Sequence, residues 1–214
     1  MWKIRTIVLV IFLPCIILAQ RNTAGFKLGM YSPEASETGF IIGFETGRYV
    51  DRFLDIGFSI DWFNKNYVDE SLIEQFDEYY GGPGGTINEV RAKTNLHDIP
   101  VMFNATGYFP VGPRVNFYVT GGIGAEVLLI WYRNFEQPND DEFKAAFDFN
   151  WRVGTGISYE LGHRSDLFAE IAYHNSEPSW TYEVDSYAGH SKRVFERKFD
   201  MSGVMFRVGV KFYY

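Results

Sequence analysis

The chain has 214 residues, of which 18% are aromatic and 21 are glycine, and its formal net charge is −7. This length suits one domain with a full core, and the mixture of aromatic residues and glycine favours strands over helices. The acidic balance excludes the basic surface with which proteins bind nucleic acid. We therefore expect a single β-structured domain with no nucleic-acid partner.

The first 19 residues predict a secretory signal peptide. Lys3 and Arg5 precede an apolar run over residues 7–18, which is too short to cross a membrane as a helix. The mature domain is then 20–214, and because it loses two positive charges its net charge is −7 − 2 = −9. The only cysteine, Cys15, lies inside the signal, so the exported domain must hold together without disulfides.

Beyond the signal, apolar and polar residues alternate over long stretches, which is typical of strands whose two faces meet different environments. The alternation over 143–161 lasts nineteen residues, whereas soluble strands usually have about 3–10. The pattern predicts eight strands, at about residues 24–32, 38–48, 53–66, 96–110, 115–133, 143–161, 166–175 and 200–214.

The connections between these strands fall into two kinds that alternate along the chain. The tight ones carry the glycine, proline and aspartate of turns; they lie at 47–51, 110–114 and 162–166. The longer or more polar ones lie at 32–38, 67–95, 134–142 and 176–199. This arrangement places short turns at one end of a barrel and long loops at the other, as in outer-membrane barrels.

Alternation alone does not show which face meets water, because a soluble lipocalin-like barrel has its apolar face inside and a membrane barrel has it outside. Large aromatic residues gather near the ends of the apolar faces, where the two bilayer interfaces would lie; they are Trp62, Phe109, Trp131, Trp151, Tyr159, Tyr173, Phe212 and Tyr214. We therefore predict an all-β, eight-stranded antiparallel transmembrane up-and-down β-barrel in the outer membrane of a Gram-negative bacterium.

The polar faces combine small residues with charges of both signs, as a narrow lumen requires. The expected lumen charges are Lys27, Glu45, Asp55, Asp61, Asp98, Glu126, Asp148, Arg152, Glu160, Glu170, Arg207 and Lys211. Such a lumen is just wide enough for side chains, so its charges must pair. We expect the four bases to pair with Glu126, Asp148, Glu160 and Glu170, and the surplus acids to lie near the mouths, be hydrated or stay protonated. This filling predicts little or no steady conductance.

Five stretches carry a family resemblance: "NLHDIPVMFNATGYFP", "FYVTGGIGAEVLL", "FDFNWRVGTGISYEL", "LFAEIAYHN" and the terminal "FRVGVKFYY". They resemble the eight-stranded outer-membrane β-barrel domain often labelled PorT-like, within the wider OmpA/OmpX-like group and the porin family. The resemblance implies that Phe212 and Tyr214 form the signal read by the barrel assembly machinery. It also allows a role beside a secretion machine, which no residue of the sequence establishes.

One motif suggests catalysis. His174 and Ser176 resemble the His-x-Ser of lipid A deacylases, in which a histidine activates a serine and an acid, here Glu183 or Glu196, orients the histidine. The alternation, however, turns His174 toward the lumen and away from lipid, so we expect a strand-end histidine and a loop serine without catalytic roles.

Two further motifs do not support a cofactor or a metal. The acidic run over 69–78 lacks the spacing of a calcium loop. The stretch "GGIGAE" at 121–126 lacks the third glycine of a nucleotide loop. We expect no cofactor and no metal.

The sequence thus predicts a monomeric, non-enzymatic scaffold whose loops at 67–95 and 176–199 contact an extracellular or envelope protein or a surface ligand. Its other expected contacts are outer-membrane lipid and lipopolysaccharide, the latter near the basic stretch 189–198. A lipid-modifying enzyme and a narrow porin remain the alternatives.

Overall fold

The computed structural model describes residues 22–68, 93–133, 141–184 and 193–214. The expected signal peptide and most of the 67–95 loop, including its acidic run, lie outside these residues. In the part of the chain that the structure describes, no helix is long and apolar enough to cross a membrane.

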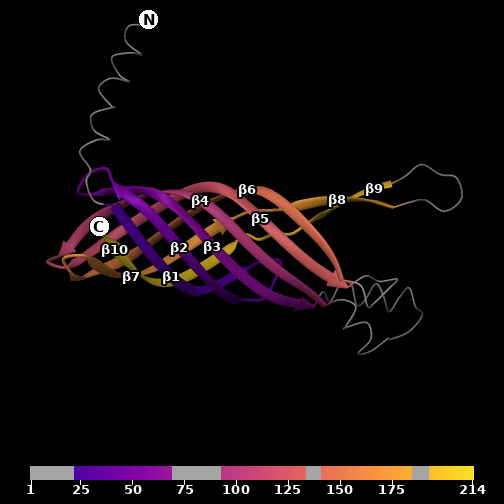
Figure 1. Cartoon of the computed structure of the whole chain (residues 1–214), viewed down its shortest axis with the longest axis horizontal. Coiled ribbons are helices and arrows are strands. Elements are labelled where there is room, and N and C mark those ends of the chain that lie inside the picture. The colour runs from indigo at the N-terminus through magenta and orange to yellow at the C-terminus, as the bar shows by residue number, and fades with distance from the viewer. Residues whose placement is uncertain (1–21, 69–92, 134–140, 185–192) are drawn as a thin grey trace, which may run out of the picture.

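Eight strands close into one antiparallel barrel (Figure 1). They are β1 (Asn22–Pro33), β2 (Gly39–Tyr49), β3 (Leu54–Val68), β4 (Lys93–Gly112), β5 (Val115–Arg133), β6 (Asp141–Gly162), β7 (Ser165–Asn175) and β10 (Gly203–Tyr213). Each pairs with its neighbours in the chain order, with β10 following β7 around the barrel. The predicted fold class is confirmed.

The last strand closes the barrel by pairing with the first. The ladder runs from Thr23↔Tyr213 to Pro33↔Gly203 without a break, and the backbones of Asn22 and Tyr214 exchange two hydrogen bonds of 3.1 Å. Closure leaves the barrel without an open edge inside the bilayer, where no water could satisfy one.

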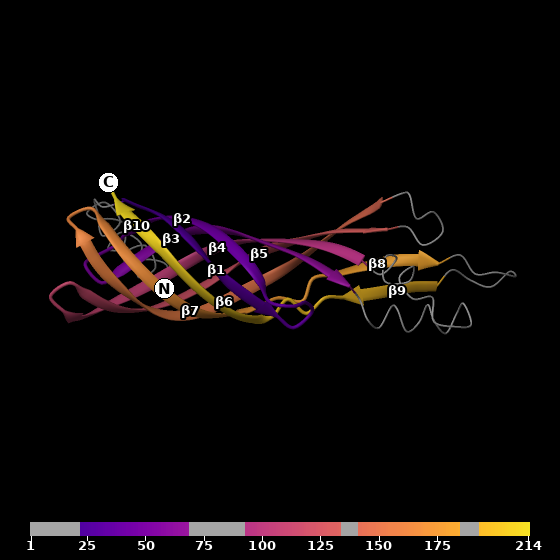
Figure 2. The same ribbon diagram turned by 90° about the horizontal axis from the view of Figure 1, so that it is seen from below.

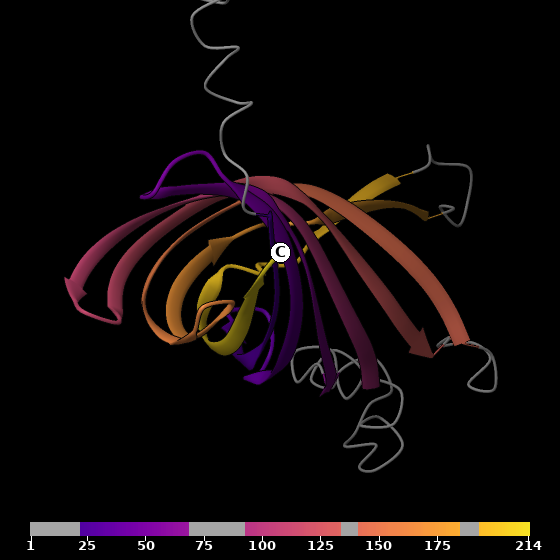
Figure 3. The same ribbon diagram turned by 60° about the vertical axis from the view of Figure 1, so that its left-hand side comes forward.

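The connection at 176–199, expected as a loop, contains two more strands. They are β8 (Ser179–Val184) and β9 (Arg193–Lys198), which pair with each other; among the described residues, one ladder pair, Phe147↔Ser179, joins them to the barrel sheet. In Figures 1 and 2 this hairpin projects from the end of the barrel that lies opposite the C-terminus. Figure 3, in which the end with the C-terminus comes forward, shows β8 and β9 extending away behind the barrel.

The exterior of the barrel is apolar. Strands β1, β7 and β10 alternate strictly between buried and exposed residues over most of their length, and the exposed set is dominated by phenylalanine, leucine, isoleucine and valine. Soluble monomeric proteins rarely expose so large a contiguous apolar surface to water. This exterior therefore faces lipid.

Aromatic residues form a row along part of the loop end of that exterior. Trp62 stacks on His97 at 5.8 Å between ring centroids, His97 meets Trp131 at 4.8 Å, and Trp131 meets Phe143 at 5.0 Å. The row crosses strands β3 to β6. Phe109 and Phe117 form a similar pair at the turn end. Two aromatic bands at the ends of an apolar wall are the arrangement of a membrane-spanning barrel.

We predict that deleting residues 212–214 impairs insertion, because the closing strand loses the end of its ladder with β1 and the terminal aromatic residues. The readout is the heat-modifiable mobility of the membrane fraction on gels. The matched control, Tyr214→Phe, keeps both the ladder and the aromatic ring and should insert normally. Normal insertion of the truncated chain would contradict the prediction.

Candidate functional site

The interior of the barrel is filled by side chains in layers, beginning at the turn end with tyrosine rings. Tyr49 packs against Tyr108 at 5.5 Å and against Tyr213 at 5.9 Å between centroids. The Tyr213 hydroxyl donates a hydrogen bond to the carboxylate of Asp166. These rings separate the turn-side mouth from the charged lumen.

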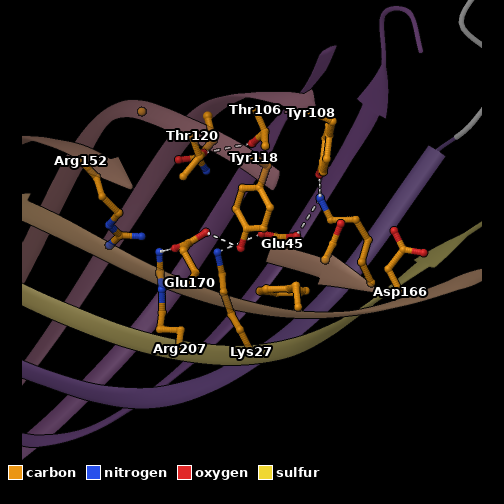
Figure 4. Close-up of a pocket in the computed structure, with 15 residues that line it drawn as sticks. Lys27, Glu45, Thr106, Tyr108, Tyr118, Thr120, Arg152, Asp166, Glu170 and Arg207 are labelled. Atoms are coloured by element: carbon orange, nitrogen blue, oxygen red, sulfur yellow. Dashed lines mark hydrogen bonds and ion pairs between the residues drawn. The ribbon is translucent and has the colours of Figure 1, made fainter. Parts of the chain in front are cut away.

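The next layer is a lysine-centred group. The Lys211 ammonium lies 3.1 Å from Glu45 Oε1 and 3.1 Å from Asp55 Oδ2, and it donates to the Tyr108 hydroxyl at 2.8 Å. The other Glu45 oxygen, Oε2, accepts from Lys27 at 2.9 Å. Two lysines and two carboxylates therefore balance each other's charge, and Figure 4 shows Lys27 and Glu45 side by side.

The middle of the lumen holds an arginine layer built on Asp61. Its Oδ2 accepts from Arg152 Nη1 at 2.6 Å and from Arg207 Nη1 at 3.1 Å. Arg207 also donates to Glu170 (Figure 4), which accepts from the Tyr118 hydroxyl at 3.3 Å. Charges taken out of water cost free energy unless they are paired and hydrogen-bonded, and here two bases meet two acids.

A glycine makes room for this layer. A Cβ on Gly43 would collide with Asp61 Oδ1 and lie 2.9 Å from Lys27 Cγ. Any larger residue would push the Asp61 carboxylate away from its two arginines. This explains a small residue on the polar face of β2.

Above the arginines lies a histidine–carboxylate layer. His174 Nε2 is 2.6 Å from Glu126 Oε2, and the Asn150 amide donates to the same oxygen at 3.4 Å. Asp98 lies diagonally across from Glu126 on the β4–β5 ladder. It is fully buried, and neither of its oxygens has a hydrogen-bond partner among the described residues.

An apolar layer closes the loop end of the lumen. It comprises Tyr31, Ile41, Phe63, Leu96, Leu128, Ile130, Ala146, Phe199, Met201 and Met205. The segment before β10 enters the barrel mouth here: Met201 is fully buried and its carbonyl accepts a hydrogen bond from the Tyr31 hydroxyl. A dry layer above a charged one separates the lumen from the loop side.

Three of the acids that were predicted to pair with lysine or arginine do not do so. Glu126 pairs with His174 instead of a lysine or an arginine. Asp148 accepts the Glu177 backbone N–H at 2.6 Å, and Glu160 is exposed at the turn-side mouth. Glu170 pairs with Arg207 as predicted. The bases otherwise pair with Glu45, Asp55 and Asp61, because these acids meet the bases inside the lumen, either from the neighbouring strand or from across the barrel.

The sequence predicts that His174 faces the lumen, but it does not predict the contact of His174 with Glu126. The sequence interpretation also passed over Tyr31, Phe63 and Met205 of the apolar layer. Strand parity alone could have placed Tyr31 and Met205 inside, because they share a face with Lys27 and Arg207.

The His174–Ser176 pair does not form a lipid-facing nucleophile. His174 is fully buried in the lumen, and Ser176 is 2% exposed with no hydrogen-bond partner for its hydroxyl among the described residues. The side chains of the two expected acids, Glu183 and Glu196, lie outside the described residues. The carboxylate that contacts the histidine is that of Glu126.

Two hollows in the described part of the barrel bear on whether the lumen is open. One of about 30 Å³ lies between Arg207, Tyr118 and Thr120, enough for one or two waters (Figure 4). The other is an open cup of about 820 Å³ at the turn-side mouth, whose lining includes Tyr49, Arg114 and Glu160. Among the residues described, no cluster of three His, Cys, Asp or Glu side chains could hold a metal ion.

These features define a small transmembrane β-barrel with a filled lumen, and solved structures share its fold. Neisserial surface protein A matches with a TM-score of 0.55 at 14% identity, over 91% of this chain and 96% of that one. A major outer membrane protein of Thermus thermophilus matches with a TM-score of 0.60 at 10% identity, over 91% and 98%. No family model and no curated protein sequence matches the chain. The fold agrees with the predicted place in the bacterial outer membrane.

We predict that Arg207→Met lowers the free energy of unfolding by about 3–5 kcal/mol, because Glu170 would be left buried without its cation. The measurement is urea unfolding in detergent or lipid. Adding Glu170→Gln should restore part of the loss. The control Arg114→Met, at an exposed turn position, should change stability by no more than about 0.5 kcal/mol. Equal effects of Arg207→Met and Arg114→Met on the free energy of unfolding would contradict the pairing of Arg207 with Glu170.

We predict that His174→Gln destabilises the barrel and leaves lipid A acylation unchanged, because His174 contacts Glu126 inside the lumen. Unfolding experiments measure the first effect, and mass spectrometry of lipid A from cells that express either protein measures the second. A changed acylation pattern would overturn the interpretation.

Proposed function

We propose that the protein is a non-enzymatic, non-conducting outer-membrane scaffold that presents its loop-side segments to a partner. The observation that carries the proposal is the closed lumen. The tyrosine rings, the two groups of ion pairs and the apolar layer follow one another along the barrel axis. A path for solutes would have to break all of them, and a narrow porin is therefore the weaker alternative.

The scaffold role is supported by what projects from the barrel. The β8–β9 hairpin continues beyond the loop end (Figure 2), and it is not needed to close the barrel. Its strand β9 belongs to the basic stretch 189–198, which favours contact with an anionic surface such as lipopolysaccharide or with an acidic protein. The PorT-like resemblance suggests a partner in a secretion machine.

The lipid-modifying alternative has less support. A serine nucleophile needs a base beside its hydroxyl and a path for the acyl chain. The His174 imidazole contacts Glu126 inside the lumen, and apolar side chains cover it from the loop side: Tyr31 meets its ring edge-on at 6.0 Å.

We predict no steady conductance when the purified barrel is reconstituted into planar bilayers, because no open path crosses the lumen. A variant without residues 177–198 should still fold, as judged by heat-modifiable mobility, because the deleted hairpin lies outside the barrel ladder. A large, stable open state of the unmodified protein would overturn the scaffold proposal in favour of the porin.

A further inference from the structure

The projecting hairpin is a continuation of the β7–β10 ladder. The last pair of that ladder is Gly203↔His174 and the first pair of the next is Ser179↔Lys198. Four residues separate these pairs on each strand, 175–178 and 199–202, so the register is the same on both sides of the gap. The hairpin is therefore one long two-stranded ribbon that starts in the bilayer.

Hydrogen bonds within the gap show which way each backbone group points. Phe199 N–H donates to the Pro178 carbonyl and Met201 N–H to the Ser176 carbonyl, both at 3.0 Å. The carbonyls of Asp200 and Ser202 point to the opposite edge, where they accept from the N–H groups of Ala35 and Glu34 at 2.7 and 2.9 Å. In the segment 199–202, the backbone N–H and C=O groups of odd-numbered residues thus point toward the β7–β8 side, and those of even-numbered residues point toward β1.

The same alternation carries into β9, because an antiparallel ladder without a register shift keeps its parity. The backbone N–H and C=O groups of Val194 and Glu196 therefore point away from β8. Strand β1 covers this side of β10. The connection after β1 continues to cover it as far as Ala35, whose N–H donates to the carbonyl of Asp200. Beyond that point no strand pairs with the outer edge of β9 among the residues that the structure describes.

We infer that this outer edge of β9 binds an extended, acidic segment of a partner protein as an added strand. The inference rests on the proposed scaffold function and names the chemistry of its partner. An unpaired strand edge is a template for main-chain hydrogen bonds. The outer edge of β9 continues, beyond the barrel, the edge along which β10 pairs with β1.

The charges of β9 favour an acidic segment as the strand that is added to its outer edge. The β9 sequence, RVFERK, contains Arg193, Arg197 and Lys198 against a single acid, Glu196. Lys198 pairs with Glu177 at 3.3 Å, so the preference for an acidic strand rests on the two arginines. An incoming acidic strand gains opposite-charge pairs with these arginines. A second copy of this chain, pairing β9 with β9, would bring like charges together, and the charges therefore disfavour the edge as a contact between copies.

The test uses the full mature barrel in lipid nanodiscs and a fluorescein-labelled peptide of alternating glutamate and valine, with fluorescence anisotropy as the readout. Glu196→Pro removes an outward N–H without removing a β8–β9 hydrogen bond. Glu196→Ala makes the same change of charge and keeps that N–H. We expect the proline variant to bind about tenfold more weakly than the alanine variant. We also expect the same peptide with alternate amides N-methylated to lose its binding to the unmodified protein.

Each other outcome overturns the inference. Equal binding of the two variants, together with undiminished binding of the N-methylated peptide, would show attraction of charge without strand pairing. Displacement of the peptide by lipopolysaccharide with no sensitivity to the proline would assign the edge to phosphates. A dimer in sedimentation experiments that Glu196→Pro dissolves would assign it to a second copy. The conductance measurement is separate, so an open pore would overturn the scaffold function whatever the peptide does.

Discussion

The structure depends on the pairing of buried charges in a lumen that has little room for water. Arg207 is the centre of this constraint, because it joins the closing strand β10 to Asp61 on β3 and to Glu170 on β7. Side chains on a strand alternate between its faces, so a slip of one residue would turn Arg207 into the lipid. The ion pairs therefore fix the register with which the barrel closes.

The same constraint shapes the rest of the lumen. Lys211 repeats the arrangement nearer the turn end with Glu45 and Asp55. Glycine at position 43 leaves space for the Asp61 carboxylate, and the apolar layer around Met201 and Met205 keeps water from the loop side. An interior committed to its own pairing leaves little room for a substrate or an ion. This is why the scaffold proposal looks for function outside the barrel, on the β8–β9 ribbon.

Much of the fold could be predicted from the sequence because the side chains of a transmembrane strand alternate between lipid and lumen, and the sequence shows this as alternating apolar and polar residues. The strand positions, the alternation of short turns and long connections, and the inward direction of Lys27, Arg152, Arg207 and Lys211 all follow from that parity. The ribbon was missed because residues 179–198 carry no long alternation of their own. Their pairing continues the register of β7 and β10, and a pattern of neighbouring residues does not show a pairing between distant segments.

The class of structure and the face on which each side chain lies are properties of the amino-acid sequence alone, since both depend on local periodicity and on the length of apolar runs. Which charges meet is a property of the closed barrel. Asp61 reaches two arginines that are 91 and 146 residues away along the chain, and Glu126 reaches a histidine instead of a lysine or an arginine. Partners in a barrel are set by strand order and by depth along the axis, and these distances exist only once the sheet has closed.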